Sequence, residues 1–508
     1  MERKVRVRFA PSPTGPLHIG GVRTALYNYL FAKKLKGDFI LRIEDTDQSR
    51  FVPGAEEYII ESLEWCGIKF DEGVHIGGQY APYRQSERKD IYKQYADYLI
   101  TKGSAYYAFD TSEDLETKKK EYESRKQTFQ YSSTNRMSMK NSLAMSDTEA
   151  AQKISNGEPY VIRIKIPEKE IVEVNDLIRG KVSVDSSQLD DKVLFKSDWF
   201  PTYHLANVVD DYLMKISHVI RGEEWLPSAP LHVLLYRYLG WENEMPLFAH
   251  LPLLLKPEGN GKLSKRDGDK LGFPVFPLKW TDPKTNEISS GYRESGYFSE
   301  AVVNILALLG WNSGTEQEIF SMEELINLFS LERVGKSGSK FDPEKAKWFN
   351  HQYLLKKTDV EIADIFTKTL KEKNIKAEHE YILSVCRIVK ERVNFISEIW
   401  GQSSFFFESP RSFDEKALKD KWKENSSQLV AEVKEIICNT ENYTAAYLKE
   451  TVSNYILEKK YGMGQVMNAL RICIVGASLG PDLFEIISML GKEEVKRRID
   501  FALQTIGV

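Results

Sequence analysis

The chain begins with a short segment in which hydrophobic and polar positions alternate. Within residues 5–9, valine and phenylalanine are separated by arginines, and this period of two predicts a β-strand. From residue 22 to residue 36 the apolar side chains recur at helical spacing, which predicts an α-helix. The residues between these segments are rich in glycine and proline, so we expect a tight turn that joins the strand to the helix.

Strand and helix patterns continue to alternate along the first 102 residues. A strand is predicted over residues 39–43, a helix from residue 53 to about residue 67, and an amphipathic helix over residues 88–102. The same character returns over residues 192–256, with a long apolar helix at 231–239. Such alternation predicts a doubly wound parallel sheet that binds its ligands at the carboxyl ends of the strands.

The segment 103–191 interrupts this sheet pattern. Residues 118–126 are dense in charge, which is typical of a solvated helical face, and alternation over 159–166 and 176–185 predicts strands. We therefore expect an inserted α+β domain between two halves of the sheet, which occupy residues 1–102 and 192–256.

Helical patterns dominate from about residue 311 to the end, with helices predicted over residues 322–329, 343–355, 360–370 and 381–399. We divide this part into a region over residues 257–375 and an α-helical domain over residues 376–508. Residues 272–291 are rich in proline and aromatic side chains, and we expect them to form a structured surface loop inserted after the sheet.

Composition narrows the class of protein. The 508 residues are 42% hydrophobic and 28% charged, as expected for a globular protein of three or more domains. No apolar run approaches the roughly 20 residues that cross a bilayer, so we expect no membrane segment. Residues 1–4 lead directly into the first strand, so we also expect no signal peptide. Four cysteines form neither a disulfide framework nor a metal pair, which favours the cytoplasm.

Two segments carry candidate chemistry: a glycine-rich turn near the N-terminus, and a lysine-rich segment that follows a second glycine-rich turn. The turn at residues 9–21 reads FAPSPTGPLHIGG, and we expect it to aim free backbone N–H groups and a helix N-terminus at an anion. Gly20 and Gly21 lack a Cβ, so a nucleotide could approach the backbone there. The second segment, KLSKR at residues 262–266, follows a turn at residues 259–261 and supplies lysines that could neutralise phosphates.

Together these segments resemble the two ATP signatures of class I aminoacyl-tRNA synthetases. Three longer strings resemble bacterial glutamyl-tRNA synthetases: RIEDTD at residues 42–47, PTYHLANVVDD at 201–211 and VIRGEEW at 219–225. The resemblance extends from residue 5 to the C-terminus. It implies a multidomain α/β protein with a Rossmann-type catalytic domain, in which residues 103–191 form a connective domain that grips the tRNA acceptor end. An all-α stem-contact and anticodon-binding region would follow.

The resemblance also implies a reaction and its partners. ATP would activate L-glutamate to glutamyl-adenylate with release of pyrophosphate, and the glutamyl group would pass to the 3′-terminal adenosine of tRNA(Glu). Mg2+ would accompany ATP, and the family suggests a monomer. The sequence leaves open whether tRNA(Gln) is also charged.

Site residues are carried over by position. ATP-binding residues would be Ser12, Thr14, His18, Gly20, Gly21, Lys262, Leu263, Ser264, Lys265 and Arg266, of which His18, Gly20, Lys262 and Lys265 would be catalytic. The glutamate site would comprise Arg8, Ser12, Glu44, Tyr203, Asn207 and Arg221. Arg392 and Arg471 would contact the tRNA anticodon.

The chemistry of glutamate agrees with these residue types. Arginine matches a carboxylate bidentately, so Arg8 and Arg221 suit the substrate's carboxylates, and Glu44 could take its ammonium group. Ser12, Tyr203 and Asn207 could supply the remaining hydrogen bonds. Tyr203 and Asn207 are four residues apart and would share a helix face.

No metal site within the protein is expected. Asp45 and Asp47 fit a turn or cap better than a ligand set, and His204, His218 and His250 lack a coherent ligand spacing. Some relatives hold zinc in the connective domain through a Cys-x-Cys pair that follows an Ala-Tyr string. Here residues 105–107 (AYY) are followed by Ala108, Phe109 and Asp110, and Asn135 and Met137 stand where the second ligand pair would fall, so we expect no zinc. The connective domain must then depend on its own apolar residues, such as Tyr106, Tyr107, Phe109 and Tyr131.

Four other functions are weaker matches. A glutamyl-queuosine synthetase lacks a C-terminal helical region, and glutaminyl-tRNA synthetases usually end in β-barrels. A nucleotidyltransferase acting on a small metabolite would not need about 200 helical residues. A non-catalytic tRNA-binding paralogue should have damaged ATP signatures, and both are intact here.

Overall fold

The computed structural model describes residues 3–506, which divide into two compact units, one extending to Ala346 and one beginning at Lys347. Each unit is considered by itself. The division falls before the border predicted at residues 375 and 376, because the helix over residues 359–372 packs against the helix that follows it in the second unit.

Two groups of mostly parallel strands form the sheet of the first unit. One has the order β1-β2-β3 and the other β7-β6-β10-β9. The strands are β1 (Arg6–Phe9), β2 (Asp38–Leu41), β3 (Glu72–Gly73), β6 (Ile171–Asp176), β7 (Gly180–Asp185), β9 (His218–Gly222) and β10 (Leu247–Leu251). Only β7 is antiparallel to its neighbour. The backbone N–H of Ser217, just before β9, donates to the carbonyl of Arg6 in β1 at 2.9 Å, which joins the two groups.

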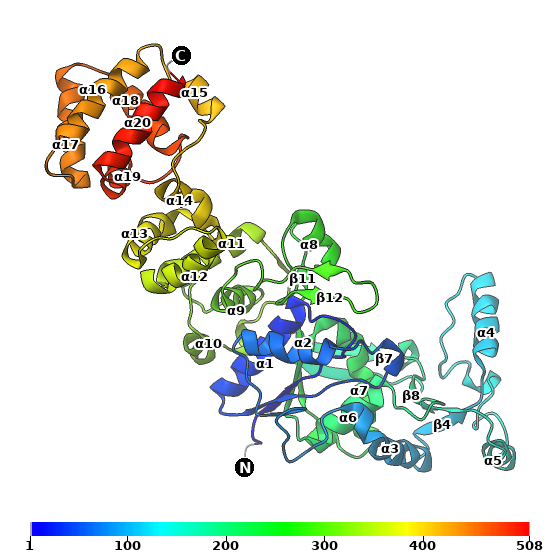
Figure 1. The fold of residues 1–508 in the computed structure, drawn as a ribbon. Coiled ribbons are helices and arrows are strands. Elements are labelled where there is room, and N and C mark those ends of the chain that lie inside the picture. The colour runs from blue at the N-terminus through cyan, green and yellow to red at the C-terminus, as the bar shows by residue number, and fades with distance from the viewer. Residues whose placement is uncertain (1–2, 507–508) are drawn as a thin grey trace. The chain divides into compact units, whose positions relative to one another are not determined.

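Helices cover this sheet as the alternating pattern predicts. They are α1 (Ile19–Lys34), α2 (Ala55–Trp65), α3 (Lys89–Thr101), α6 (Tyr203–Leu213) and α7 (Ala229–Tyr238). Two later helices, α9 (Ser299–Leu308) and α10 (Met322–Leu328), pack on α1. Helix α1 packs on β1 and β2 and also against α9 and α10 (Figure 1), so its side chains are buried on more than one face. Leu26 and Leu30 are fully buried, and each contributes about 1.5–3 kcal/mol relative to an exposed position.

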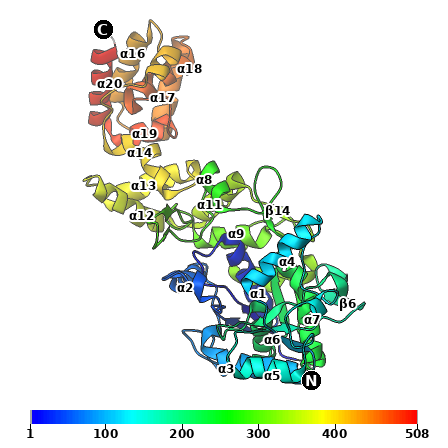
Figure 2. The ribbon, with the colours of Figure 1, turned by 90° about the vertical axis from the view of Figure 1, so that its right-hand side faces the viewer.

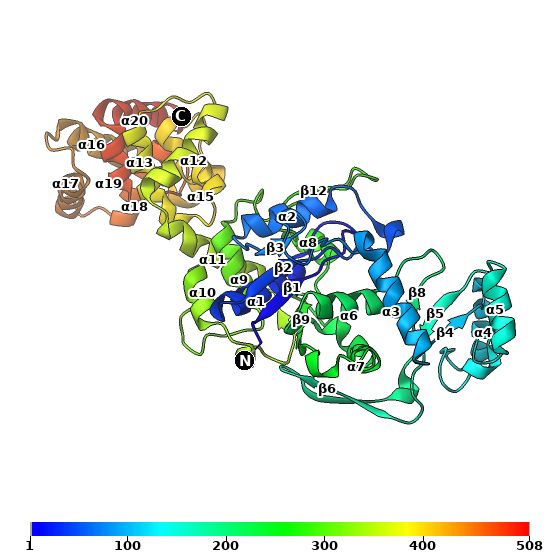
Figure 3. The same ribbon diagram turned by 90° about the horizontal axis from the view of Figure 1, so that it is seen from below.

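The inserted segment builds a separate three-stranded sheet from β4 (Ala105–Ala108), β5 (Val161–Ile164) and β8 (Val193–Phe195). Figure 3 shows β4 and β5 beside the helices α4 (Ser112–Ser124) and α5 (Asp147–Ser155). Its small core includes Tyr106, Tyr131 and Met139. Helix α4 buries none of its residues, as its charge pattern predicts.

Strand pairing differs from the predicted borders of this insertion at two places. The hairpin of β6 and β7 lies within residues 103–191, yet β6 pairs with β10 of the catalytic sheet. Strand β8 lies beyond residue 191, yet it pairs with β5 of the inserted sheet. The chain therefore returns to the catalytic sheet for one hairpin before it closes the insertion, and a local pattern cannot reveal that order.

The segment 272–291 is ordered. It follows α8 (Lys265–Leu271) and contains a hairpin of β12 (Trp280–Thr281) and β13 (Ile288–Ser289). The Tyr58 hydroxyl of α2 donates to the Leu278 carbonyl at 2.5 Å and accepts from the Leu278 N–H at 3.2 Å, while Trp280 packs edge-to-face on the same ring. Strand β11 (Leu254–Leu255) pairs in parallel with β14 (Ser339–Lys340), which lies far along the chain but in the same unit.

The second unit is helical throughout. Its helices are α11 (Pro343–Lys356), which begins just before the border, α12 (Asp359–Glu372), α13 (His379–Val389), α14 (Ile399–Phe407), α15 (Glu415–Lys421), α16 (Ser426–Asn439), α17 (Ala445–Glu458), α18 (Met463–Val475), α19 (Leu483–Leu490) and α20 (Lys492–Ile506). Helices α16, α18 and α20 pack side by side (Figure 2). Across residues 3–506, the structure contains no helix with the length and apolarity that a membrane crossing requires.

The helix predicted over residues 381–399 is wrong in its extent, because α13 ends at Val389. The backbone at Val393 is extended, and its carbonyl bonds the ring of His351 at 2.7 Å. The Asn350 amide donates to the next carbonyl, that of Asn394, at 2.7 Å. These contacts from α11 use carbonyls that a continuous helix would need for its own ladder.

Candidate functional site

A cleft of about 740 Å3 opens at the carboxyl ends of β1 and β9, where parallel sheets bind their ligands. It gathers every residue predicted for the glutamate site, namely Arg8, Ser12, Glu44, Tyr203, Asn207 and Arg221. It also gathers most of those predicted for ATP: Ser12, Thr14, His18, Gly20, Gly21, Lys262 and Leu263. Segments more than 200 residues apart thus meet in one cleft.

The turn after β1 is built differently from the expectation of free backbone N–H groups. The N–H of Ile19 donates to the Val275 carbonyl at 3.0 Å, that of Gly20 to the His18 ring at 3.1 Å, and that of Gly21 to the His18 carbonyl at 2.8 Å. The expectation is therefore wrong for these three amides. Gly21 lines the cleft, and a Cβ there would also lie 2.6 Å from the end of the Leu17 side chain.

His18 instead offers a side-chain donor to the cleft. Its Nδ1 caps α1 by accepting from the Gly20 N–H, so in the neutral ring the proton lies on Nε2. That Nε2 is buried and has no hydrogen-bond partner among the described residues. Burial, with a further contribution from Lys262, lowers the pKa of His18 to about 4, so the ring is neutral near pH 7. Because His18 lines the cleft, this N–H is a candidate donor to a phosphate oxygen.

Only the first part of the KLSKR segment lines the cleft. Lys262 and Leu263 line it, and the Lys262 amine lies 2.8 Å from Glu224, another lining residue. Ser264, Lys265 and Arg266, predicted to bind ATP, are not among the described lining residues. Ser264 caps α8 together with Asp267. The Lys265 amine lies 2.6 Å from Glu287 of the 272–291 segment, in an exposed ion pair of the kind worth about 0–1 kcal/mol.

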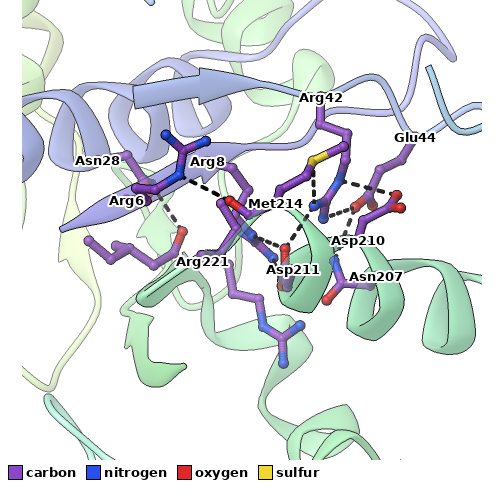
Figure 4. A network of polar contacts seen from close by, with 12 residues as sticks. Arg6, Arg8, Asn28, Arg42, Glu44, Asn207, Asp210, Asp211, Met214 and Arg221 are labelled. Atoms are coloured by element: carbon purple, nitrogen blue, oxygen red, sulfur yellow. Dashed lines mark hydrogen bonds and ion pairs between the residues drawn. The ribbon is translucent and has the colours of Figure 1, made fainter. Parts of the chain in front are cut away.

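Arg8 is paired within the protein (Figure 4). Its Nε and Nη2 donate to the two oxygens of Asp211 at 3.0 and 3.3 Å, and both side chains are buried. Asp211 also accepts from Arg42 at 2.8 Å. Burial acts to raise the pKa of Asp211, but Arg8 and Arg42 outweigh it and hold the pKa below its ordinary value. The charge of Arg8 is therefore offset by a carboxylate before any ligand binds.

The network continues beneath the cleft. Arg42 lies 3.1 Å from Glu44 and 3.8 Å from Asp210, and Asp210 accepts from Arg88 at 2.8 Å. Three arginines (Arg8, Arg42 and Arg88) thus face three carboxylates (Glu44, Asp210 and Asp211). Gln85 and Tyr92 complete the hydrogen bonds of Asp210. The equal number of opposite charges allows the network to remain buried.

Arg221 has a different environment. Its Nε donates to His250 Nε2 at 3.0 Å, its Nη1 to the Tyr203 hydroxyl at 2.7 Å, and its Nη2 lies 3.4 Å from the Trp225 carbonyl. Within residues 3–506, no carboxylate oxygen lies within 4.0 Å of the Arg221 guanidinium. Arg221 is only 5% exposed and lines the cleft, so an anionic ligand is the partner that its charge lacks.

Glu44 and Asn207 form the acidic side of the cleft. The Asn207 amide donates to Glu44 at 3.0 Å, and the Asn207 oxygen is buried without a hydrogen-bond partner among the described residues. Burial raises the pKa of Glu44, although Arg42 and Arg8 act to lower it. A ligand ammonium group would favour the charged carboxylate and could also donate to the Asn207 oxygen.

Several lining or supporting residues had no role in the sequence analysis. They are Lys196, Asp211, Glu224 and His250. Asp211 could have been found, since it follows Tyr203 and Asn207 at the same four-residue spacing on α6. Asp45 accepts from the Ser86 backbone and hydroxyl at 2.8 and 2.6 Å, a tertiary contact between two segments 41 residues apart.

Residues 3–506 hold no group of three or more histidines, cysteines or carboxylates arranged to bind a metal ion. In the inserted domain, Asp110 accepts from Tyr131 at 3.0 Å and Asn135 donates to the Gln130 carbonyl at 2.7 Å. The absence of zinc from this domain stays a prediction.

Arg392 and Arg471 both lie in the second unit. Arg471 donates to the carbonyls of Leu479 and Pro481 at 3.1 and 2.8 Å, and burial, with Arg392 contributing, lowers its pKa. Arg392 is exposed. The two side chains are near enough to interact electrostatically, but Arg471 is partly occupied by backbone carbonyls.

Comparison with known proteins covers nearly the whole chain. Residues 4–348 match the family described as tRNA synthetases class I (E and Q), catalytic domain, and residues 354–503 match the anticodon binding domain family. Glutamate--tRNA ligases from Bacteroides fragilis and Parabacteroides distasonis are 58% and 60% identical over 506 residues, 99% of each chain. A solved glutamate tRNA ligase from Elizabethkingia meningosepticum, in complex with its amino acid, is 52% identical with a TM-score of 0.95, and the match covers 99% of this chain and 100% of that one.

Proposed function

This chain belongs to the glutamate--tRNA ligase family of class I aminoacyl-tRNA synthetases, and on that premise we propose that the cleft at the ends of β1 and β9 binds L-glutamate and ATP side by side. The enzyme attaches glutamate to tRNA(Glu) in two steps. Glutamate is first activated by ATP, and the glutamyl group is then transferred to the 3′-terminal adenosine of the tRNA.

The buried Arg221 carries this proposal most directly. Glutamate differs from most amino acids by a second carboxylate, and Arg221 presents to the cleft a guanidinium whose protein partners are His250, Tyr203 and the Trp225 carbonyl. A carboxylate that binds there gains a charge-assisted hydrogen bond. Arg8 keeps its pair with Asp211 and offers its remaining Nη1, while Glu44 and the Asn207 oxygen receive the α-ammonium group.

His18 and Lys262 act on the phosphates of ATP. In the first step a glutamate α-carboxylate oxygen forms a bond to the α-phosphorus, and the bond to the pyrophosphate oxygen breaks. The neutral His18 donates its Nε2–H to a phosphate oxygen, and Lys262 exchanges Glu224 for the departing phosphates. Lys265 also neutralises the phosphates, after its exposed ion pair with Glu287 has opened. Mg2+ enters with the phosphates as part of the substrate.

The remaining parts of the chain have proposed roles in binding tRNA. Residues 103–191 grip the acceptor end, residues 257–375 contact the stem, and the helices of residues 376–508 read the anticodon. Arg392 stacks on or bonds anticodon bases, and Arg471 orders the neighbouring loop as well as contacting RNA. The enzyme acts as a monomer in the cytoplasm. The helical second unit opposes the shorter queuosine-modifying relatives and the relatives that end in β-barrels.

Aminoacylation of purified tRNAs tests the proposal. Purified enzyme, MgATP and radiolabelled glutamate should charge tRNA(Glu), whereas glutamine should not be transferred. Parallel reactions with tRNA(Gln) determine whether the enzyme discriminates between the two tRNAs. Failure to charge tRNA(Glu) under conditions in which a known relative is active would contradict the proposal.

A further inference from the structure

Three neighbouring strands place polar residues in a line at the carboxyl edge of the sheet. Asp176 is the last residue of β6, His250 lies near the end of β10, and Arg221 lies near the end of β9. In the β9–β10 pair, His250 stands directly opposite Arg221. The strand order β6-β10-β9 therefore sets the histidine between the carboxylate and the arginine.

The hydrogen bonds along this line have a single consistent direction. A guanidinium can only donate, so His250 Nε2 must accept from Arg221 Nε at 3.0 Å. The ring proton then lies on Nδ1, which donates to Asp176 Oδ2 at 2.6 Å. A carboxylate at that position selects the one neutral tautomer that can hold Arg221.

Asp176 is itself fixed by backbone donors. Its Oδ1 accepts from the N–H groups of Ile178 and Arg179 at 2.9 and 2.8 Å, and Oδ2 accepts from the His250 N–H at 3.1 Å. The carboxylate therefore has little freedom to turn, and neither does the imidazole that it holds. Phe248 stacks beside the His250 ring with its centroid 6.2 Å away.

Burial keeps the imidazole in the required neutral state. The side chains of Asp176 and His250 are fully buried. Burial lowers the pKa of His250, although Asp176 acts to raise it, and the nearby Arg221 and Arg179 also disfavour a second ring proton. An imidazolium would have no lone pair for Arg221 and would place two cations in contact.

We propose that Asp176 and His250 are positioning residues that orient the Arg221 guanidinium for the side-chain carboxylate of glutamate. This inference rests on the proposed role of Arg221 and assigns a new role to two residues that touch neither substrate. The arrangement holds Arg221 from its Nε side without neutralising it. A direct Asp–Arg pair would instead compete with the substrate for the same charge.

Two substitutions of His250 separate positioning from simple structural support. His250→Asn keeps an amide donor near the Nδ1 position, toward Asp176, but removes the acceptor for Arg221. His250→Gln can place its amide oxygen near the Nε2 position and restore that acceptor. Steady-state aminoacylation with each variant gives the KM values for glutamate and for ATP. Loss of one hydrogen bond to a charged group predicts a rise of about tenfold or more in the glutamate KM of His250→Asn.

The expected pattern is selective. His250→Asn should raise the glutamate KM with the ATP KM changed less than about twofold, and His250→Gln should recover most of the loss. His218 lies on β9, as Arg221 does, but it is bonded to Ser217 and does not line the cleft. The control variant His218→Gln should therefore leave both KM values unchanged. An unchanged glutamate KM in His250→Asn, or equal rises in both KM values for both His250 variants, would overturn the inference.

Asp176→Asn keeps the inference testable if His250→Asn fails to fold. The amide retains an oxygen for the backbone donors of residues 178 and 179 but no longer favours the Nδ1 tautomer, so the glutamate KM should again rise selectively. A normal glutamate KM in a folded Asp176→Asn variant overturns the role of Asp176. In the same assay, Arg221→Met distinguishes the two claims: if it raises the glutamate KM while His250→Asn does not, only the positioning role fails, and if it has no effect, the proposed function of Arg221 fails as well.

Discussion

The two arginines of the cleft are both buried and both face the same ligand site, yet the protein holds them in opposite ways. Arg8, on β1, is held by the carboxylate of Asp211 (Figure 4), which belongs to a network of three arginines and three carboxylates. Arg221, on β9, is held by an imidazole, a phenol and a carbonyl. The fold neutralises the charge of Arg8, whereas the protein partners of Arg221 are uncharged, and we propose that the substrate supplies the missing carboxylate.

This difference predicts that the two arginines have different roles: Arg8 in the stability of the fold, and Arg221 in the choice of substrate. A buried ion pair costs several kcal/mol when one partner is removed, because the other charge stays buried without compensation. The pair of Arg8 with Asp211 therefore supports the fold as well as the site. Removal of Arg221 leaves no carboxylate uncompensated, so we expect its charge to matter more for substrate binding than for stability.

The largest expected effect is on catalysis by Arg221→Met. Methionine keeps much of the apolar volume but removes the cation that meets the second carboxylate. We expect kcat/KM for glutamate to fall roughly a hundredfold to a thousandfold, with ATP binding retained. Steady-state charging of tRNA(Glu) measures the first quantity, and equilibrium ATP binding measures the second. A loss below about tenfold would mean that the two arginines do not differ as described.

The matched substitution Arg8→Met should affect stability most. It leaves two arginines against three buried carboxylates, and we expect the free energy of unfolding to fall by about 3–5 kcal/mol. Arg221→Met should lower it by only about 1 kcal/mol, through lost packing and hydrogen bonds. Urea unfolding followed by tryptophan fluorescence measures both variants. Equal losses of stability in the two variants would contradict the proposed difference between Arg8 and Arg221.

A double variant tests whether charge balance explains the loss. Arg8→Met combined with Asp211→Leu leaves Arg42 and Arg88 facing Glu44 and Asp210, two charges of each sign. We expect it to recover about half of the stability lost in Arg8→Met, because the uncompensated carboxylate is gone. Activity should not recover, since the guanidinium of Arg8 is still missing. If the double variant is less stable than Arg8→Met, the loss has another cause.

Acid should weaken the hold of His250 on Arg221. Burial lowers the pKa of His250, so its neutral form is complete above the ordinary histidine pKa of about 6.5 and is lost as the pH falls through the lowered value. The pKa of Asp211 is held below its ordinary carboxylate value, so Arg8 keeps its charged partner below the ordinary aspartate pKa. The charged or titratable groups that face His250 are Asp176, Arg179, Arg221 and His232.

The measurement for this pH effect is the glutamate KM between about pH 7.5 and about pH 5. In the unmodified enzyme it should rise toward acid by less than about tenfold, and in His250→Gln the rise should be smaller, because the amide does not titrate. The nearby histidines remain in both proteins, so the difference between the two profiles isolates His250. Parallel profiles would contradict the assignment.

Local patterns predicted much of this molecule and none of the pairing between its distant parts. Strand and helix periodicity located β1, α1, α11 and α12 and predicted a helical C-terminal part, and the four-residue spacing of Tyr203 and Asn207 predicted their shared face. The same spacing would also have placed Asp211 on that helix face. The line from Asp176 to His250 spans 74 residues and depends on strand order, which the alternation of polar and apolar residues does not encode.

The failures have physical causes of the same kind. The amides of residues 19–21 were expected to be free, but the Val275 carbonyl and the His18 side chain and backbone satisfy them. The helix predicted to reach residue 399 ends early because Asn350 and His351 bond the carbonyls that would continue it. In both places a partner distant in the sequence decides the local structure.

A crystal structure of this enzyme with bound glutamate would test the central claim most directly. The account predicts that the side-chain carboxylate lies within hydrogen-bond distance of the Arg221 guanidinium, with Nε still bonded to His250. It also predicts that Arg8 keeps both hydrogen bonds to Asp211 and reaches the substrate only through Nη1. A carboxylate that misses Arg221, or that draws Arg8 away from Asp211, would contradict the division of roles between the two arginines.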